Sequence, residues 1–160
     1  MRNTPIILAV RKHEDSVGSC IVLQVAFTRK PLRIVWDKFL EEDYTLCVTD
    51  EILYEYEEKI AQLTGSRDVA QTVIDIILNA DNVERVNVFY HYGLIKSDVD
   101  DNKFVDCAIT ANARYVVTED THFNELKHIE FPKVDVINML DFIEILKNID
   151  NISKKQILPH

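Results

Sequence analysis

The sequence predicts an α/β fold with a mainly parallel central sheet, and three observations lead to this prediction. Short apolar segments alternate along the chain with longer segments whose apolar residues recur at helical spacing, a pattern typical of βαβ units. The chain has 160 residues, 47% of them hydrophobic, which is enough for one domain with a buried core. Its three glycines and four prolines exclude collagen-like and low-complexity classes. We therefore expect a single domain over residues 1–147, followed by a polar tail over residues 148–160.

The individual elements follow from apolar spacing and from capping residues. Pro31 suits the first turn of a helix, Thr49 and Ser66 are candidate N-caps, and Gly65 separates the two helices that these caps begin. Helical spacing predicts helices over residues 31–40, 50–63, 67–77, 100–109, 121–127 and 140–146. Short apolar runs predict strands over residues 6–10, 20–27, 44–48, 83–89, 114–118 and 134–137.

The charge of the chain is uneven and limits the possible functions. The formal net charge of -9 argues against binding nucleic acid by broad neutralisation of phosphates. The first 40 residues hold seven basic and three acidic side chains, whereas the remaining 120 hold 11 basic and 24 acidic ones. The acidic part is either an ordinary solvated surface or a group of carboxylates that needs a divalent cation.

The cysteines and the apolar runs indicate the cellular setting. The three cysteines are scattered and fit neither a disulfide framework nor a zinc site. The longest apolar runs are far shorter than a membrane span, and no small-residue cleavage site follows the apolar run at the start of the chain. We therefore expect a cytoplasmic protein that does not enter a membrane.

Carboxylates follow the predicted strands in three places, and parallel sheets bind ligands at the carboxyl ends of their strands. The helix after residues 44–48 carries Glu55 and Glu57 at the edges of its apolar stripe, and periodicity does not choose between them. Asp120 comes two residues after the strand at 114–118, where it is either a helix cap or a ligand.

The third place is the segment from Ser97 to Ala108, which contains four aspartates. Asp100 and Asp101 are each either an N-cap or a site acid. Asp106 lies on a helix that is apolar around most of its circumference, so its carboxylate needs a partner or a metal. Converging carboxylates repel one another unless a cation is present, and Mg²⁺ or Mn²⁺ prefers oxygen ligands. This chemistry favours a metal-dependent phosphodiesterase or nuclease.

Three blocks of the sequence resemble the PIN domain family, in particular its toxin branch from bacterial toxin–antitoxin systems. The blocks are residues 46–58, 98–109 and 116–123, and the resemblance extends over residues 32–142. It implies a three-layer α/β/α fold and Mg²⁺- or Mn²⁺-dependent cleavage of RNA. It also implies a small antitoxin protein as partner and a homodimer as the assembly.

The resemblance also assigns roles to individual residues by matching position. The acid of the second motif is Glu55, which the family and not periodicity selects over Glu57. The acid of the third motif is Asp106, with Asp101 as a neighbouring catalytic acid, and the acid of the fourth is Asp120. In this reading Glu55, Asp106 and Asp120 hold the metal. The substrate-binding residues would be Thr118 and Asn102.

Residues 1–31 depart from the family pattern, which begins with a strand that runs directly into Asp. Here residues 6–10 are followed by Arg11 and Lys12, and the nearest acid next to a hydroxyl residue is Asp15. Asp15 is therefore the candidate for the missing first acid. The basic side chains of this part either guide RNA or are simply solvated: Arg11, Lys12, Arg29 and Lys30.

Two alternatives to a nuclease follow from this departure. One is a degenerate, catalytically inactive PIN domain that binds RNA or a protein. The other is a phosphoacceptor receiver domain, which needs an acid pair directly after its first strand and a lysine after a late strand. The pair Glu14-Asp15 is displaced from the first strand and residues 118–120 contain no lysine, so the receiver class is disfavoured.

Overall fold

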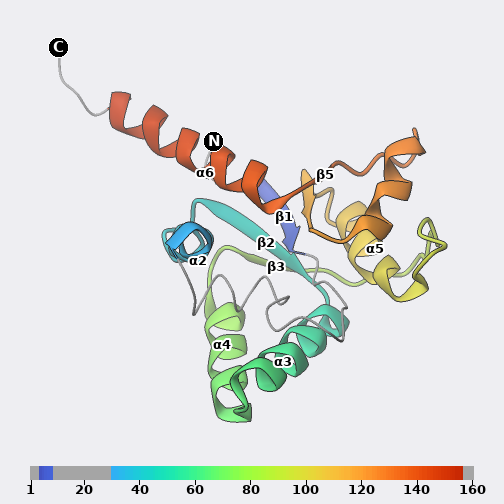
Figure 1. The fold of residues 1–160 in the computed structure, drawn as a ribbon, viewed down its shortest axis with the longest axis horizontal. Coiled ribbons are helices and arrows are strands. Elements are labelled where there is room, and N and C mark those ends of the chain that lie inside the picture. The colour runs from blue at the N-terminus through green and yellow to red at the C-terminus, as the bar shows by residue number, and fades with distance from the viewer. Residues whose placement is uncertain (1–3, 9–29, 157–160) are drawn as a thin grey trace.

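The computed structural model describes residues 4–8 and 30–156, and its centre is a five-stranded sheet (Figure 1). The strand order is β3-β2-β1-β4-β5, and every pair of neighbours is parallel. The strands are β1 (Thr4–Leu8), β2 (Tyr44–Val48), β3 (Val83–Arg85), β4 (Tyr115–Val117) and β5 (Val136–Ile137). The predicted α/β class with a parallel sheet is confirmed.

Helices lie on both sides of this sheet, with α6 passing above β2 in Figure 1 and α3 and α4 below it. Helix α2 packs against β2 and α6, and α5 packs against β1, β2 and β4. The helices are α2 (Lys30–Leu40), α3 (Asp50–Thr64), α4 (Arg67–Asn79), α5 (Asn102–Thr110) and α6 (Met139–Gln156). Two 3₁₀ helices, η1 (Val99–Asp101) and η2 (Thr121–His128), precede α5 and follow β4.

The capping residues begin and end helices as the sequence predicts. Thr49 Oγ1 accepts a hydrogen bond from the backbone N–H of Ile52, which satisfies one of the unpaired donors in the first turn of α3. Ser66 caps α4 in the same way by accepting from Val69. Gly65 ends α3 with a φ of 67°, in the left-handed region that glycine adopts without strain.

Several predicted elements differ in length from the observed ones, and two of the differences are large. The strand expected over residues 83–89 ends at Arg85, because β3 is an edge strand and the chain leaves the sheet after Val86 donates to the carbonyl of Val48. The last helix does not end at residue 146, so the polar tail expected from residue 148 is helical to Gln156. The contact of Lys38 with Asp150 ties this extension to α2.

Several expectations lie outside the described residues. They are the strand over residues 20–27, the departure of residues 1–31 from the family pattern apart from β1, and the roles of Asp15, Arg11, Lys12 and Arg29. Lys30 is described only as the first residue of α2. Strand β1 itself begins and ends two residues earlier than expected, at Thr4 and Leu8.

The core between sheet and helices fixes the elements that carry the acidic residues. Side chains of β2, α3, α5 and β4 with almost no exposed surface form it: Leu46, Val48, Ile52, Tyr56, Phe104, Val105, Val116 and Val117. Burying an aliphatic or aromatic side chain of this size stabilises the fold by about 1.5–3 kcal/mol. The start of α5 and the end of β4 are therefore held rigidly. Within residues 30–156, no helix has the length and apolar character needed to cross a membrane.

Candidate active site

The topology of the sheet determines where a ligand site is expected. From the central strand β1 the chain continues to β2 on one side, and β4 lies on the other side. Leu8, the last residue of β1, pairs with Val117, the last residue of β4. Open parallel sheets bind ligands at the carboxyl ends of the strands beside such a reversal of strand order. A ligand site is therefore expected among the residues that follow β2 and β4.

Four polar side chains converge beyond β4 and at the start of α5. His122 Nδ1 lies 3.2 Å from Asp120 Oδ1, 3.4 Å from Asp101 Oδ2 and 3.9 Å from Asp98 Oδ2. We call Asp98, Asp101, Asp120 and His122 the acidic cluster. It combines Asp120, which the resemblance assigns to the fourth motif, with Asp101, the expected neighbour of the third-motif acid.

Local hydrogen bonds hold two acids of the acidic cluster in place. Asp120 caps η2 by accepting from the backbone N–H of His122 at 2.9 Å, and its own N–H donates to Thr118 Oγ1 at 3.0 Å. Asp98 caps η1 by accepting from the N–H of Asp100. Asp120 and Asp98 are thus both helix caps and members of the acidic cluster. The two roles expected as alternatives for Asp120 are compatible. Asp101 makes no capping bond to α5.

Asp101 is the most buried acid of the cluster. Its side chain is only 1% exposed, and its Oδ2 has no hydrogen bond of good geometry, although His122 Nδ1 lies 3.4 Å away. Burial raises the pKa of Asp101 to about 6, the negative charges of Asp120 and Asp98 raise it as well, and His122 acts in the opposite direction. A buried carboxylate oxygen without a well-formed hydrogen bond, beside two further carboxylates, has the chemistry of a ligand for an oxygen-preferring divalent cation. Asp98, Asp101 and His122 each offer a ligand atom within 4.8 Å of the others.

Glu55 has a different partner. The ammonium of Lys103 contacts Glu55 Oε2 and lies 3.6 Å from Asp100 Oδ2. Glu55 is buried, whereas Glu57 is only partly buried. This agrees with the resemblance, which selects Glu55 as the acid of the second motif. A lysine already balances the charge of the acid expected to hold metal.

Asp106 contacts the loop that follows β3. It is 2% exposed, and its Oδ1 accepts from the backbone N–H of Tyr92 at 3.1 Å. Its Oδ2 lies 3.1 Å from His91 Nδ1. The structure therefore places Asp106 beside His91, five residues along the chain from Asp101 of the acidic cluster. Its expected role as a metal ligand remains a prediction.

Asn102 and Thr118, the expected substrate-binding residues, make structural hydrogen bonds. Asn102 is buried, its Oδ1 accepts from Ile95 N and its Nδ2 donates to the carbonyls of Ile95 and Val99. Asn102 thus anchors the loop to α5. Thr118 is buried and holds the backbone of Asp120.

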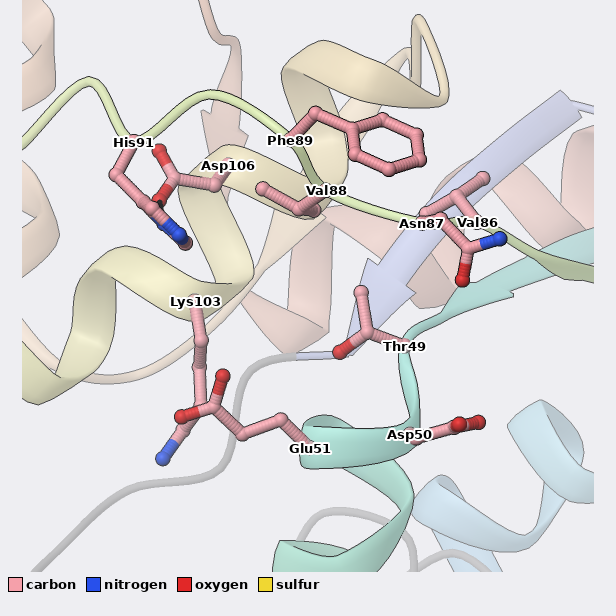
Figure 2. A pocket seen from close by; sticks show the side chains of 10 residues that line it. All are labelled: Thr49, Asp50, Glu51, Val86, Asn87, Val88, Phe89, His91, Lys103 and Asp106. Carbon is pink, nitrogen blue, oxygen red and sulfur yellow. Dashed lines mark hydrogen bonds and ion pairs between the residues drawn. The ribbon is translucent and has the colours of Figure 1, made fainter.

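A pocket opens beside Asp106, between the loop after β3, the start of α3 and the first turns of α5 (Figure 2). Its volume is about 390 Å³. Figure 2 shows His91 and Asp106 turned toward each other at one end and Asn87 at the other. Lys103 and Thr49 also line it, so the pocket adjoins the Glu55–Lys103 pair.

Three residues of this region are not among the site residues predicted from the sequence. Asp98 and His122 join the acidic cluster, and Lys103 pairs with Glu55. Two signals were available: His122 lies two residues from Asp120, and Lys103 is the single cation in a run rich in aspartate. Neither signal states which carboxylate the side chain reaches.

A second group of acids in residues 30–156 is structural. Glu41, Asp43 and Asp150 surround the buried ammonium of Lys38, at 2.6 Å from Glu41 and 2.9 Å from Asp43. The lysine therefore supplies the positive charge that these carboxylates need.

Comparison with known proteins agrees with this architecture. The family model described as "PIN domain" matches residues 17–122, about two thirds of the chain. Among solved structures, the chain is similar to the crystal structure of VapBC2 from Rickettsia felis bound to a DNA fragment from their promoter. The TM-score is 0.53 at 16% identity, over 84% of this chain and 98% of that one. At this identity the likeness concerns the fold alone. None of the curated proteins matches the chain.

Proposed function

The chain belongs to the PIN domain family, and from this premise we propose that it is an endoribonuclease of the toxin type. In this proposal it hydrolyses RNA phosphodiester bonds with Mg²⁺ or Mn²⁺ held by the acidic cluster. We also propose that it works in the cytoplasm as a homodimer, with a small antitoxin protein as its partner. The similar structure of VapBC2 from Rickettsia felis supports the toxin assignment.

The observation that carries the proposal is the buried Oδ2 of Asp101, whose one neighbouring donor in the acidic cluster, His122 Nδ1 at 3.4 Å, makes no hydrogen bond of good geometry. Placing an ionised carboxylate in a buried position without a donor is costly unless a cation balances it. Asp120 and Asp98 add further negative charge around the same point. We propose that Asp101, Asp120 and Asp98 hold the cation and that His122 is a further ligand or fixes the two acids that it contacts.

The other residues act on the phosphate and on the shape of the site. When bound, Mg²⁺ or Mn²⁺ supplies positive charge that offsets the charge developing on a phosphodiester attacked by water. Lys103 is held by Glu55 and adds a fixed positive charge near the start of α5. Thr118 keeps Asp120 in position through its backbone. Asp106, which the resemblance assigns to the metal, positions His91 in our proposal.

The experiment is a Mn²⁺ titration by calorimetry, followed by an RNA cleavage assay with and without EDTA. Wild type is expected to bind Mn²⁺ and to cleave RNA only when Mn²⁺ or Mg²⁺ is present. Asp101→Asn should lose both properties. Asp75→Asn, an exposed acid on α4, is the matched control and should keep both. Equal Mn²⁺ binding in wild type and Asp101→Asn would contradict the proposed site.

The Glu55–Lys103 pair favours one second candidate function. A lysine at an expected ligand position is also consistent with an inactive PIN domain that binds RNA or a protein partner. Wild type that binds RNA tightly but neither binds Mn²⁺ nor cleaves would establish this alternative.

A further inference from the structure

We propose that the pocket beside Asp106 binds the base and ribose of one unpaired nucleotide of the RNA substrate. Phe89 would supply the stacking surface and His91, oriented by Asp106, the hydrogen-bonding group. This inference rests on the proposed ribonuclease function, because it names how the substrate is held next to the acidic cluster.

The first support is the fixed orientation of His91. Its imidazole is mostly exposed, but its Nδ1 lies 3.1 Å from a carboxylate that is itself buried. A carboxylate accepts hydrogen bonds, so His91 donates from Nδ1, and in the neutral ring Nε2 remains as an acceptor. The other oxygen of Asp106 is held by the N–H of Tyr92, so the carboxylate cannot turn away. The pair therefore presents an acceptor suited to a hydroxyl or an amino group.

The second support is an aromatic surface on the same loop. Phe89, which lines the pocket, is 91% exposed, and Tyr90 and Tyr92 beside it are also exposed and in edge contact, with ring centroids 4.6 Å apart. The loop is anchored on both sides, by Val86 to β2 and by Ile95 to Asn102. Three aromatic side chains exposed on one anchored loop, with Phe89 at the pocket, offer a surface on which a flat ring can stack. Unpaired RNA bases stack on such side chains.

The third support is the polarity and size of the pocket. A volume of about 390 Å³ is in the range of small-ligand sites. Thr49 and Asn87 line it and offer a hydroxyl and an amide, which can pair with the edges of a base. Asp106 and Glu51 also line it and disfavour a phosphate. The uncharged part of a nucleotide, with its hydroxyl groups and its aromatic ring, matches these walls.

The fourth support is the position of the pocket relative to the acidic cluster. Lys103 and Asp106 on α5 line the pocket, and Asp101 of the acidic cluster directly precedes this helix. Five residues of helix span about 7.5 Å along the axis. A nucleotide in the pocket would thus place a neighbouring phosphate toward the acidic cluster, with Lys103 between the two.

The test uses a short fluorescein-labelled single-stranded RNA and DNA of the same sequence, with Ca²⁺ in place of Mg²⁺ to limit cleavage. Fluorescence polarisation gives the affinities. Phe89→Ala is expected to weaken RNA binding by about tenfold, the scale of one lost base stack. Phe131→Ala, an equally exposed phenylalanine outside the pocket, is the matched control and should bind like wild type. His91→Ala should reduce the preference for RNA over DNA, because His91 Nε2 would accept a hydrogen bond from the ribose 2′-hydroxyl, which DNA lacks.

The outcomes separate this inference from the proposed function. Both variants change side chains at the surface, so circular dichroism and thermal melting should show intact folding. Wild-type affinity in Phe89→Ala and His91→Ala, together with normal metal-dependent cleavage, would overturn the nucleotide pocket and leave the nuclease standing. Loss of RNA binding in Phe89→Ala with unchanged Mn²⁺ binding would support the pocket. If Phe89→Ala affected only capture of a protein partner, the aromatic loop would be a protein interface and the proposal would be wrong.

Discussion

The ammonium of Lys103 contacts the carboxylate of Glu55, and the two side chains are only 10% and 8% exposed. The pair joins α3 to the first turn of α5. Neither oxygen of Glu55 has a hydrogen bond of good geometry, so the lysine charge is what balances this acid. The pair therefore contributes both to the stability of the fold and to the electrostatics of the site.

Removing the lysine alone is expected to destabilise the protein strongly. Lys103→Met leaves Glu55 buried without a counter-charge, and breaking a buried pair in this way costs about 3–5 kcal/mol. The double variant Lys103→Met with Glu55→Gln should recover most of the loss, because it removes both charges. Urea denaturation measured by circular dichroism in EDTA gives the free energies of unfolding. A single variant as stable as wild type would show that the pair is not formed in solution.

Asp101 is expected to make the metal-free protein less stable as the pH rises. Burial, reinforced by Asp120 and Asp98, raises the pKa of Asp101 from 3.8 to about 6. The folded chain thus holds this proton more tightly than the unfolded chain. The resulting contribution to the free energy of unfolding is full below about pH 3.8 and is lost as the pH rises through about 6.

Asp101→Asn removes this titration and should stabilise the metal-free protein at pH 7 by about 2 kcal/mol. The gain should shrink toward pH 4, where Asp101 is largely protonated in the folded state. Thermal melting in EDTA at a series of pH values measures the difference between the two proteins. Adding Mn²⁺ should raise the melting temperature of wild type and leave that of Asp101→Asn unchanged. A stability difference that does not vary with pH would contradict the raised pKa.

The sequence was sufficient to predict most of the fold. Helical spacing and capping residues located α3 and α4, because Thr49, Ser66 and Gly65 act through local backbone geometry. Part of the extension of the last helix is visible in the spacing, because Ile149 continues the apolar positions of Phe142 and Leu146 and packs against the core. The contact between Lys38 and Asp150 is not visible there, because the two residues lie 112 positions apart.

The residues of the candidate site could be predicted from the sequence, but the contacts between their side chains could not. Motif positions selected Glu55, Asp101, Asp106 and Asp120, and the structure shows that all four are buried. The partners of Asp101 and Asp106 depend on their positions around the axis of α5 and on the course of the loop after β3, whereas Glu55 on α3 pairs with Lys103 of α5. That loop brings His91 to Asp106, whereas η2 brings His122 to Asp101. Neither contact is visible in local spacing.

Asp106 and Asp101 are expected to respond differently to removal of their charge. If the acidic cluster holds the cation, Asp106→Asn should bind Mn²⁺ with an affinity near that of wild type. Asp101→Asn and Asp120→Asn should each lower it at least tenfold, roughly the smallest effect of changes around a metal site. Calorimetry compares the three variants.

The imidazole protons of His91 provide an independent readout by NMR. They should shift in Asp106→Asn, which loses the carboxylate beside Nδ1, and should stay in place in Asp101→Asn. Loss of Mn²⁺ binding in Asp106→Asn, with intact folding, would show that the family assignment of Asp106 to the metal is correct and ours is not.

Lys38 is expected to fasten α6 to the rest of the fold. Burial lowers the pKa of Lys38, but the carboxylates of Asp150, Glu41 and Asp43 raise it by more, so the pKa lies above its usual value and the lysine stays charged. Lys38→Met leaves three acids without their shared cation and should lower the free energy of unfolding by about 3 kcal/mol. Lys147→Met is the matched control on α6, because its pair with Glu144 is exposed and worth less than about 1 kcal/mol. Urea denaturation measures both. Hydrogen exchange should also show that the amides of α6 exchange faster in Lys38→Met but not in Lys147→Met, because α6 contributes Asp150 to the network around Lys38. Equal exchange rates in the two variants would mean that apolar packing alone holds α6.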